Sequence, residues 1–155
     1  LIMESRIGSR LDNCTRALPD LAVCVHLSLQ WDVDFDAQVL RGRAEWTVKR
    51  RALDVSSVVL DAKSLEISAI TIEGRPASFE LGDPHEAFGQ SLTIHLDDEA
   101  KKVIQLKVVI IYETTPQSSA LQWLAKELTA GQAHPYLFTQ CEAIHARALL
   151  PCQDT

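Results

Sequence analysis

Turn-forming residues interrupt this sequence about every ten residues, and the segments between them alternate apolar and polar side chains. In an extended chain successive side chains point to opposite faces, so this alternation predicts strands with one buried face. No apolar pattern with the helical period extends over about 12 residues. The sequence therefore predicts an all-β fold with little helix, arranged as an antiparallel or mixed β-sandwich or as a saddle-like curved sheet.

The clearest pair of strands lies between Ala22 and Lys49. Apolar residues occupy every second position from Val23 to Trp31, and the pattern places Cys24 on the opposite, polar face. A turn at Asp36–Ala37 follows, and alternation resumes from Leu40 to Lys49. These two segments predict a long antiparallel hairpin.

Further elements follow from the same patterns. Short strands are expected at 55–60, 65–72, 78–81, 92–96, 102–112 and 136–139. The segment 102–112 is the most apolar and is rich in β-branched residues, which is typical of a central strand. Residues 120–129 are expected to form one or two helical turns, ended by Gly131. Residues 143–150 are expected to be a short helical or irregular piece.

The length of 155 residues suits one domain with a sizeable core. Residues 1–18 show no clean period and are expected to be a loosely ordered lead to a domain over 19–155. The net charge is −6, from 15 basic and 21 acidic residues. Nucleic acids and anionic membranes both select basic surfaces, so neither is an expected partner.

The sequence also indicates the cellular compartment of the protein. No apolar run approaches the roughly 20 residues of a membrane span, and no signal sequence opens the chain. The four cysteines (Cys14, Cys24, Cys141 and Cys152) have no CxxC spacing. Four cysteines in a chain of this length are typical of free thiols in a reducing compartment, which favours a cytoplasmic protein.

The residues carry no pattern of a complete catalytic centre. None of the five histidines forms a HExxH pair, so neither a zinc site nor another metal site is expected within this chain. The GxSxG nucleophile motif and a glycine-rich phosphate loop are also missing. No catalytic residue is therefore assigned, and the three tryptophans are expected to pack in the core.

Two polar residues near the end of the chain form a candidate binding platform. If the strand at 136–139 continues, Gln140 and Glu142 share one face and Cys141 takes the other. An amide beside a carboxylate can hold a cationic group such as the ammonium of a peptide N-terminus. The alternative is an ordinary strand with a polar outward face.

The identities of the residues in this region are more specific than their spacing. Thr139–Gln140 is followed by Glu142, then by the basic residue Arg147 and by Pro-Cys-Gln-Asp-Thr at 151–155, and Ser-Ser-Ala-Leu-Gln-Trp-Leu precedes it at 118–124. These segments resemble the family of zinc aminopeptidases that includes leukotriene A-4 hydrolase. The resemblance extends more thinly back to about Cys14.

The resemblance implies a fold and a role. In this family an N-terminal, saddle-shaped β domain caps the active site, and the zinc motifs lie in a following catalytic domain, which this sequence does not contain. The family's β domain also continues beyond the position of Thr155, so 19–155 is expected to be a truncated portion. By the same resemblance, Gln140, Cys141 and Glu142 reach into the cleft and bind the N-terminal end of a peptide substrate.

The expected function follows from that role. The full-length parent would be a zinc metallo-aminopeptidase, with the catalytic domain and the peptide N-terminus as partners of this chain. The chain alone is predicted to be inactive and to bind no zinc. Leukotriene A-4 hydrolase has Gln where Glu142 stands, so epoxide hydrolase activity of the parent is less firmly implied than aminopeptidase activity. The alternative is a non-catalytic β-sandwich interaction domain.

Overall fold

The computed structural model describes residues 12–155. Ten strands lie in this part of the chain: β1 (Ala22–Asp34), β2 (Val39–Arg50), β3 (Ser57–Ala62), β4 (Leu65–Ile72), β5 (Arg75–Pro76), β6 (Phe79–Leu81), β7 (Gln90–His95), β8 (Gln105–Thr114), β9 (Leu121–Leu124) and β10 (Tyr136–Thr139). Four 3-10 helices of three residues each also lie in this part of the chain: η1 (Ala100–Lys102), η2 (Lys126–Leu128), η3 (Ala130–Gln132) and, after the last strand, η4 (Ala146–Ala148). Every strand pair is antiparallel. The predicted all-β class with little helix is confirmed.

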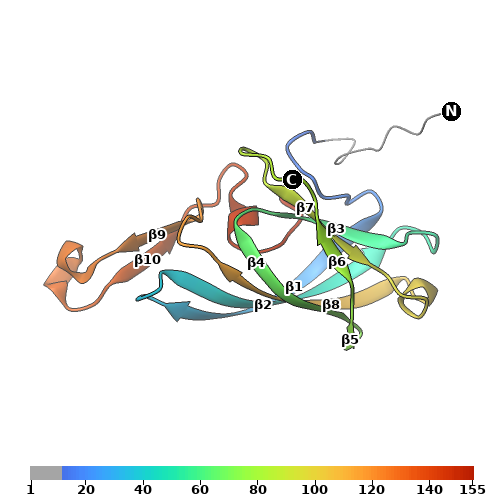
Figure 1. The fold of residues 1–155 in the computed structure, drawn as a ribbon, viewed down its shortest axis with the longest axis horizontal. Helices are drawn as coiled ribbons and strands as arrows, with labels where there is room; N and C mark the ends of the chain where they lie inside the picture. Colours follow the sequence, from blue (N-terminus) through green and yellow to red (C-terminus); the bar gives the residue numbers. More distant parts are fainter. Residues whose placement is uncertain (1–11) are drawn as a thin grey trace.

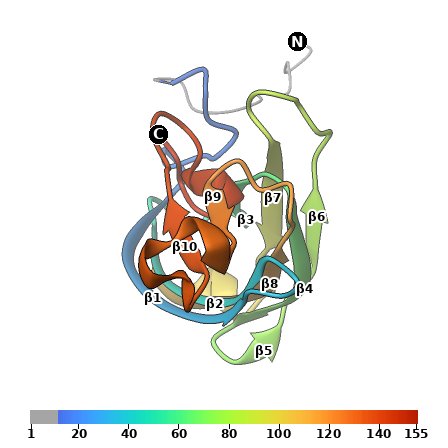
Figure 2. The ribbon, with the colours of Figure 1, turned by 90° about the vertical axis from the view of Figure 1, so that its left-hand side faces the viewer.

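The strands form three sheets. A five-stranded sheet has the order β1-β2-β8-β4-β5, a three-stranded sheet has the order β3-β7-β6, and β9 pairs with β10 alone. The large sheet curves beneath the three-stranded sheet, as the end-on view shows (Figure 2). The β9–β10 hairpin extends sideways from this two-layered body (Figure 1).

The core lies between the two larger sheets. Strict alternation on β2 buries Leu40, Ala44 and Val48, and the neighbouring strand β8 buries every second residue from Leu106. The three-stranded sheet contributes Leu60 and its partners to the same apolar cluster. Aliphatic side chains from both inner faces fill this layer, as in other sheet-on-sheet packings. The predicted hairpin of residues 22–49 and the central position of β8 are both confirmed.

One extra residue in β1 reverses part of the predicted face pattern. The register between β1 and β2 shifts between Cys24 and His26, which makes Val25 the bulged residue. Val25 is therefore 53% exposed, whereas Cys24 packs against the core. The prediction that Cys24 lies on the polar face is wrong, because a bulge changes the side-chain phase by one residue.

Other boundaries also differ from the prediction. The strands expected at 55–60, 78–81 and 92–96 are shifted by one or two residues, and two further segments change more. The segment 120–129 begins as strand β9 and turns into the 3-10 helices η2 and η3 only from Lys126. Pairing with β10 supplies backbone hydrogen bonds that a lone helical turn would lack, so tertiary pairing overrides the local pattern. In the segment 102–112, residues up to Lys102 belong to η1, and the strand begins at Gln105.

The start of the chain contains packed residues where a loose lead was expected. Residues 1–11 lie outside the described part. Thr15 and Ala17 are buried, and Thr15 donates a hydrogen bond from its hydroxyl to the carboxylate of Asp61 on β3. Residues 15–17 therefore belong to the body of the domain. In the described chain no helix has the length and apolarity needed to cross a membrane.

Candidate substrate-recognition site

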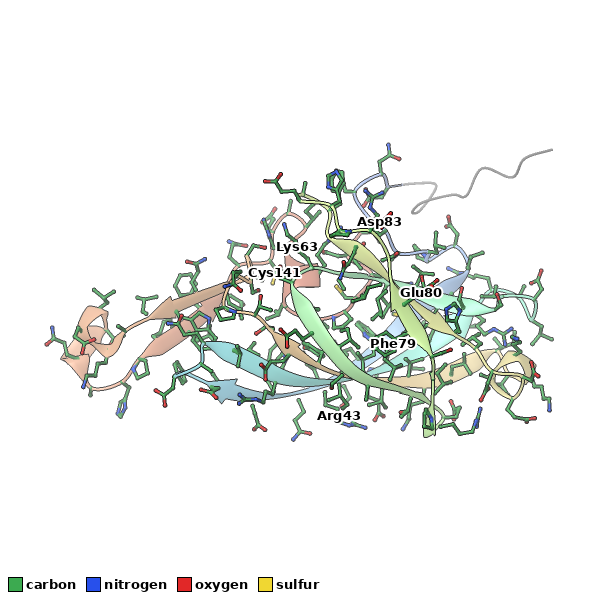
Figure 3. All side chains as sticks on the ribbon, in the orientation of Figure 1. Arg43, Lys63, Phe79, Glu80, Asp83 and Cys141 are labelled. Carbon is green, nitrogen blue, oxygen red and sulfur yellow. The ribbon has the colours of Figure 1, made fainter. Side chains whose placement is uncertain are left out.

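The segment Gln140–Glu142 lies at the base of the β9–β10 hairpin. Strand β10 ends at Thr139, which is paired with Leu121, and the Gln140 N–H donates to the Ala120 carbonyl at 2.9 Å. The pairing thus continues for one residue beyond the strand and then stops. Cys141 marks the point where the hairpin joins the body (Figure 3).

The three residues are arranged by a turn and not by strand alternation. The Glu142 N–H donates to the side-chain Oε1 of Gln140 at 2.9 Å, and the peptide bond from Glu142 to Ala143 is cis. Gln140 and Glu142 are both exposed, whereas Cys141 is half-buried against the core. The platform expected from an extended strand therefore exists as a turn whose first side chain bonds the backbone of its third residue.

A second contact fixes the far side of this turn. The His145 N–H donates to the Cys141 carbonyl at 2.8 Å. The Nδ1 atom of His145 lies 2.7 Å from the Ser119 hydroxyl, which belongs to the connection between β8 and β9. The turn is therefore held both to the following residues and to the opposite side of the hairpin base.

These hydrogen bonds leave the amide NH2 group of Gln140 and the carboxylate of Glu142 free to bind a ligand. The Oε1 atom of Gln140 already accepts one hydrogen bond, so its amide NH2 group is left to donate outward. Within residues 12–155, the Glu142 carboxylate forms no ion pair and receives no hydrogen bond. An exposed carboxylate beside an amide donor can bind an ammonium group together with a neighbouring carbonyl oxygen. Burial raises the pKa of the Cys141 thiol, which keeps it protonated and unsuited to nucleophilic attack.

The chain after this turn is anchored by a buried arginine. Arg147 is fully buried and pairs its Nε with Asp154 Oδ2 at 3.0 Å. Its Nη1 donates to the carbonyl oxygens of Cys14 and Phe88, at 2.7 and 2.8 Å. The nearby Ser118 hydroxyl donates to the Ala148 carbonyl at 2.6 Å. These contacts fix residues 145–154 against three other segments, which gives the turn a rigid support.

Aromatic side chains continue the exposed face of β10. Tyr136 is 57% exposed and Phe138 is 42% exposed, and their ring centroids lie 6.2 Å apart. Both alternate in phase with Gln140 along the strand. The hairpin thus presents an apolar stripe that ends at the polar turn.

The described residues do not fit a zinc site. In residues 12–155 no three His, Cys, Asp or Glu side chains gather into a group that could hold a metal ion. Of the exposed histidines, His26, His85 and His95 lie on surfaces of the body, and His134 lies on the hairpin just before β10. Zinc requires three or four converging ligands, so the chemistry of a metal centre cannot be assigned to these residues.

Sequence reasoning selected Gln140, Cys141 and Glu142 but expected them on an extended strand, and it missed the contacts that hold the turn. Ser119 and Asp61 carried no signal, because their partners are distant in sequence, at His145 and Thr15. Arg147 and Asp154 belonged to the segments that resemble the family, but no pairing between them was expected. A buried arginine seven residues before an aspartate gives no periodic pattern, so the pairing emerges only from the fold.

Comparisons with known proteins identify the family of this chain. A family model described as the Peptidase M1 N-terminal domain matches residues 23–155. Leukotriene A-4 hydrolase from Xenopus laevis is 40% identical over 144 residues, which are 93% of this chain and 24% of that protein. Leucine aminopeptidase 2 from Aspergillus niger is 38% identical over 134 residues, 86% of this chain and 22% of its own length. The chain thus spans about a quarter of the length of the curated relatives that it matches.

Solved structures give the same result. The structure of yeast LTA4 hydrolase in complex with bestatin superposes with a TM-score of 0.86 at 30% identity, over 98% of this chain and 24% of that one. An M1 zinc metallopeptidase from Deinococcus radiodurans has a TM-score of 0.57 at 20% identity over 86% of this chain and 29% of its own, a likeness of fold alone. The family match, the relatives and the shared fold place this chain in the M1 peptidase family, as an N-terminal domain of that family.

Proposed function

We propose that this chain caps the active site of a longer zinc aminopeptidase and that Gln140, Cys141 and Glu142 help to bind the N-terminus of its peptide substrate. The observation that carries the proposal is the exposed, unpaired carboxylate of Glu142 on a turn in which the Glu142 backbone N–H donates to Gln140 Oε1 at 2.9 Å. Because this hydrogen bond holds the backbone of the turn, less conformational entropy is lost on binding an α-ammonium than in a mobile loop.

The roles of the three residues differ. Glu142 would accept hydrogen bonds from the substrate ammonium, and the Gln140 NH2 group would donate to a carbonyl oxygen nearby. Cys141 would act through its backbone, because its half-buried side chain packs against the core. The bond from the His145 N–H to the Cys141 carbonyl holds that backbone in place. None of these residues takes part in bond cleavage.

The catalytic step would belong to the rest of the parent polypeptide. Zinc, where bound there, would lower the pKa of a water molecule and so supply the nucleophile for peptide hydrolysis. The exposed Tyr136 and Phe138 of the projecting hairpin support contact with that catalytic domain, since a lone two-stranded hairpin gains little stability in water. We further propose a cytoplasmic location, supported by four free cysteines.

Aminopeptidase activity is the better supported of two parent activities. The relatives include leucine aminopeptidase 2 and leukotriene A-4 hydrolase, and Glu142 supplies the negative charge that suits a peptide ammonium. An epoxide hydrolase activity in the parent has no such support from this turn, because an epoxide offers no cation to a carboxylate.

The test replaces Glu142 in the full-length polypeptide that carries this domain. A charge-assisted hydrogen bond is worth roughly 1.5–3 kcal/mol, so Glu142→Ala should lower kcat/KM for peptides about 10- to 150-fold. Glu142→Gln should cost less, because it keeps an acceptor oxygen. The matched control is Glu127→Ala, which removes an exposed carboxylate at the far end of the same hairpin. Unchanged kinetics in a folded Glu142→Ala enzyme would refute the site and favour a plain interaction domain.

A separate measurement concerns the 155-residue chain by itself. We expect no peptide hydrolysis by this chain and no zinc retained after dialysis against a mild chelator, because the described residues offer no converging ligand set. Stoichiometric zinc together with measurable turnover would contradict this expectation.

A further inference from the structure

A cavity of about 380 Å³ lies between the connection from β3 to β4 and the loop from β6 into β7. Its volume is within the range of small-molecule sites. The residues that line it come from these two segments: Lys63, Ser64, Pro84, His85, Glu86, Gly89 and Gln90. None of them belongs to the turn formed by Gln140–Glu142, the recognition turn. Lys63 and Asp83, the latter near the start of the loop, both lie on the upper side of the body (Figure 3).

A lysine in this cavity has an ammonium group without a partner. Lys63 is half-buried, and within residues 12–155 its side chain forms no ion pair and no hydrogen bond. Partial removal of an ammonium from water is unfavourable unless an anion or another acceptor replaces the lost hydration. The lysine therefore favours a ligand that brings a negatively charged group into the cavity.

The loop supplies a second donor, the ring of His85. Its Nδ1 atom accepts the N–H groups of Ala87 and Phe88 at 3.1 and 3.2 Å. Because Nδ1 is an acceptor, the ring proton lies on Nε2, which is left to donate. The ring stacks on Phe88 with centroids 4.6 Å apart, and the backbone of His85 forms two hydrogen bonds of 2.8 Å with Gly89. The imidazole donor is therefore held in a fixed position.

Both walls of the cavity are bonded to the same buried residue. The Lys63 N–H donates to the Arg147 carbonyl at 2.8 Å, and Arg147 Nη1 donates to the Phe88 carbonyl at 2.8 Å. The cavity thus keeps its shape without a ligand, and a site that is already formed loses less conformational entropy on binding.

Negative charge on the loop restricts the kind of anion that can bind. Glu86 lines the cavity, and Asp83 precedes the lining residue Pro84. Two carboxylates near one ammonium disfavour a multiply charged anion such as phosphate. A ligand with one carboxylate and one ammonium suits the set, because the carboxylate can accept from Lys63 and His85 while the ammonium donates to Glu86. A free α-amino acid carries both groups on one carbon atom.

Two other cavities of similar size contain no unpaired lysine or arginine. One, of about 390 Å³, is lined by Arg41, which pairs with Asp34 and Glu113 at 2.9 and 2.8 Å. Another, of about 340 Å³, is lined by Asp97, which pairs with Arg75 at 3.0 Å. The charged groups of these two cavities already have partners. The unpaired lysine therefore distinguishes the first cavity.

We propose that the cavity between the β3–β4 connection and the β6–β7 loop is a binding site for a free α-amino acid. Lys63 and His85 hold the carboxylate of the ligand, and Glu86 holds its ammonium. Ser64 and Gln90 offer further hydrogen-bonding groups. The proposal does not rest on the proposed function, because the cavity shares no residue with the recognition turn.

The test follows the backbone amide signals of the 155-residue chain by NMR while glycine is added to about 100 mM. The amides of Ser64, Ala87 and Gly89 should shift and saturate with a dissociation constant of about 1–10 mM, as expected for a ligand of few atoms. Acetate lacks the ammonium and methylamine lacks the carboxylate. These two probes and phosphate should each bind at least about tenfold more weakly than glycine.

Variants test the role of each charged group. Lys63→Met keeps the aliphatic stem and the backbone N–H, and it should weaken glycine binding at least about tenfold. Glu86→Gln should weaken the binding of glycine by a similar factor without weakening that of acetate. Lys49→Met is the matched control, since it removes an exposed lysine on β2, outside the cavity, and should leave glycine binding unchanged. The same spectra show whether each variant is folded.

Three results would overturn the proposal. The first is the lack of a saturable shift with glycine in the folded chain. The second is acetate or phosphate binding as tightly as glycine, which would leave no role for the ligand ammonium. The third is glycine binding that survives Lys63→Met or Glu86→Gln in a folded variant.

Discussion

Arg147 and Asp61 are both fully buried, and Nη1 of the arginine lies 3.4 Å from Oδ1 of the aspartate. Asp61 also accepts hydrogen bonds from the N–H of Arg16 at 2.5 Å and from the N–H of Asp154 at 3.1 Å. The pair therefore joins β3 to both ends of the described chain. The buried pair contributes to stability only with this full set of partners, because a buried charge with fewer hydrogen-bond partners destabilises the fold.

Removing the arginine should destabilise the domain strongly. Arg147→Met leaves the Asp61 carboxylate buried beside fewer donors, and loss of one partner of a buried pair costs about 3–5 kcal/mol of the free energy of unfolding. Urea denaturation followed by circular dichroism measures the change. Arg43→Met, which removes an exposed ion pair with Glu45, should leave the midpoint nearly unchanged. Equal effects of the two substitutions would show that the buried network has no special role.

Gly42 is expected to tolerate no side chain. A Cβ atom at this position of β2 would overlap the ring of Tyr112, whose hydroxyl would lie 2.7 Å away. Gly42→Ala should therefore lower the free energy of unfolding by about 1–3 kcal/mol, the usual cost of overpacking. The cost should shrink when Tyr112 is changed to Ala, and thermal unfolding of the four variants of this double-mutant cycle measures it. A cost that is independent of residue 112 would assign the effect to the strand backbone.

Stability should fall at high pH. Burial raises the pKa of Tyr112 from 10.0 to about 12, against a smaller opposing effect of the hydrogen bond from Trp31. Between about pH 10 and pH 12 the unfolded chain loses this proton while the folded chain keeps it. The stabilisation is thus complete below pH 10 and is lost as pH rises toward 12. Urea midpoints measured against pH should show this decline.

A conservative substitution separates the tyrosine from other groups in that pH range. Burial also raises the pKa of Cys24 from 9.0 to about 12, and its effect has the same sign. Tyr112→Phe should remove only the tyrosine part of the decline, and a tyrosinate absorbance titration should lose the corresponding late step. An unchanged slope of stability against pH in Tyr112→Phe would contradict the assignment.

The bond between Ser119 and His145 should steady the recognition turn. Ser119→Ala removes a neutral hydrogen bond worth about 0.5–1.5 kcal/mol, so the amide of His145 should exchange its hydrogen roughly 2- to 13-fold faster. Amide exchange measured by NMR tests this effect. The amide of Val48 in the core provides an internal control, and equal acceleration at both amides would mean that the whole domain had been destabilised.

The sequence predicted those parts of the fold in which local pattern and tertiary structure agree. The hairpin of β1 and β2 was predicted correctly because apolar alternation is strict on β2, where one face is buried by the three-stranded sheet. The range of β4 was predicted to the residue. In both cases the period of two along the chain reflects the two faces of a sheet.

The errors arose where a distant contact decides the structure. The bulge at Val25 has no local signature, and it alone turns Cys24 toward the core. Strand β9 resembles a helical segment by itself and becomes extended because β10 pairs with it. The candidate site residues were proposed from the residue identities of their segment, but their arrangement depends on Ala120, a neighbour in space.

The hairpin of β9 and β10 behaves as an arm attached at one end. Its attachment consists of the bonds around Ser119, Ala120 and Cys141 and of the contact between the rings of Trp123 and Phe35, whose centroids lie 5.5 Å apart. Its far end, at η2 and η3, projects away from the body. When such an arm swings, displacement grows with distance from the pivot, so the tip moves most and the pivot least. Gln140 and Glu142 lie at the pivot. The domain thus places Gln140 and Glu142, which we propose to bind substrate, where bending of its longest projection disturbs them least.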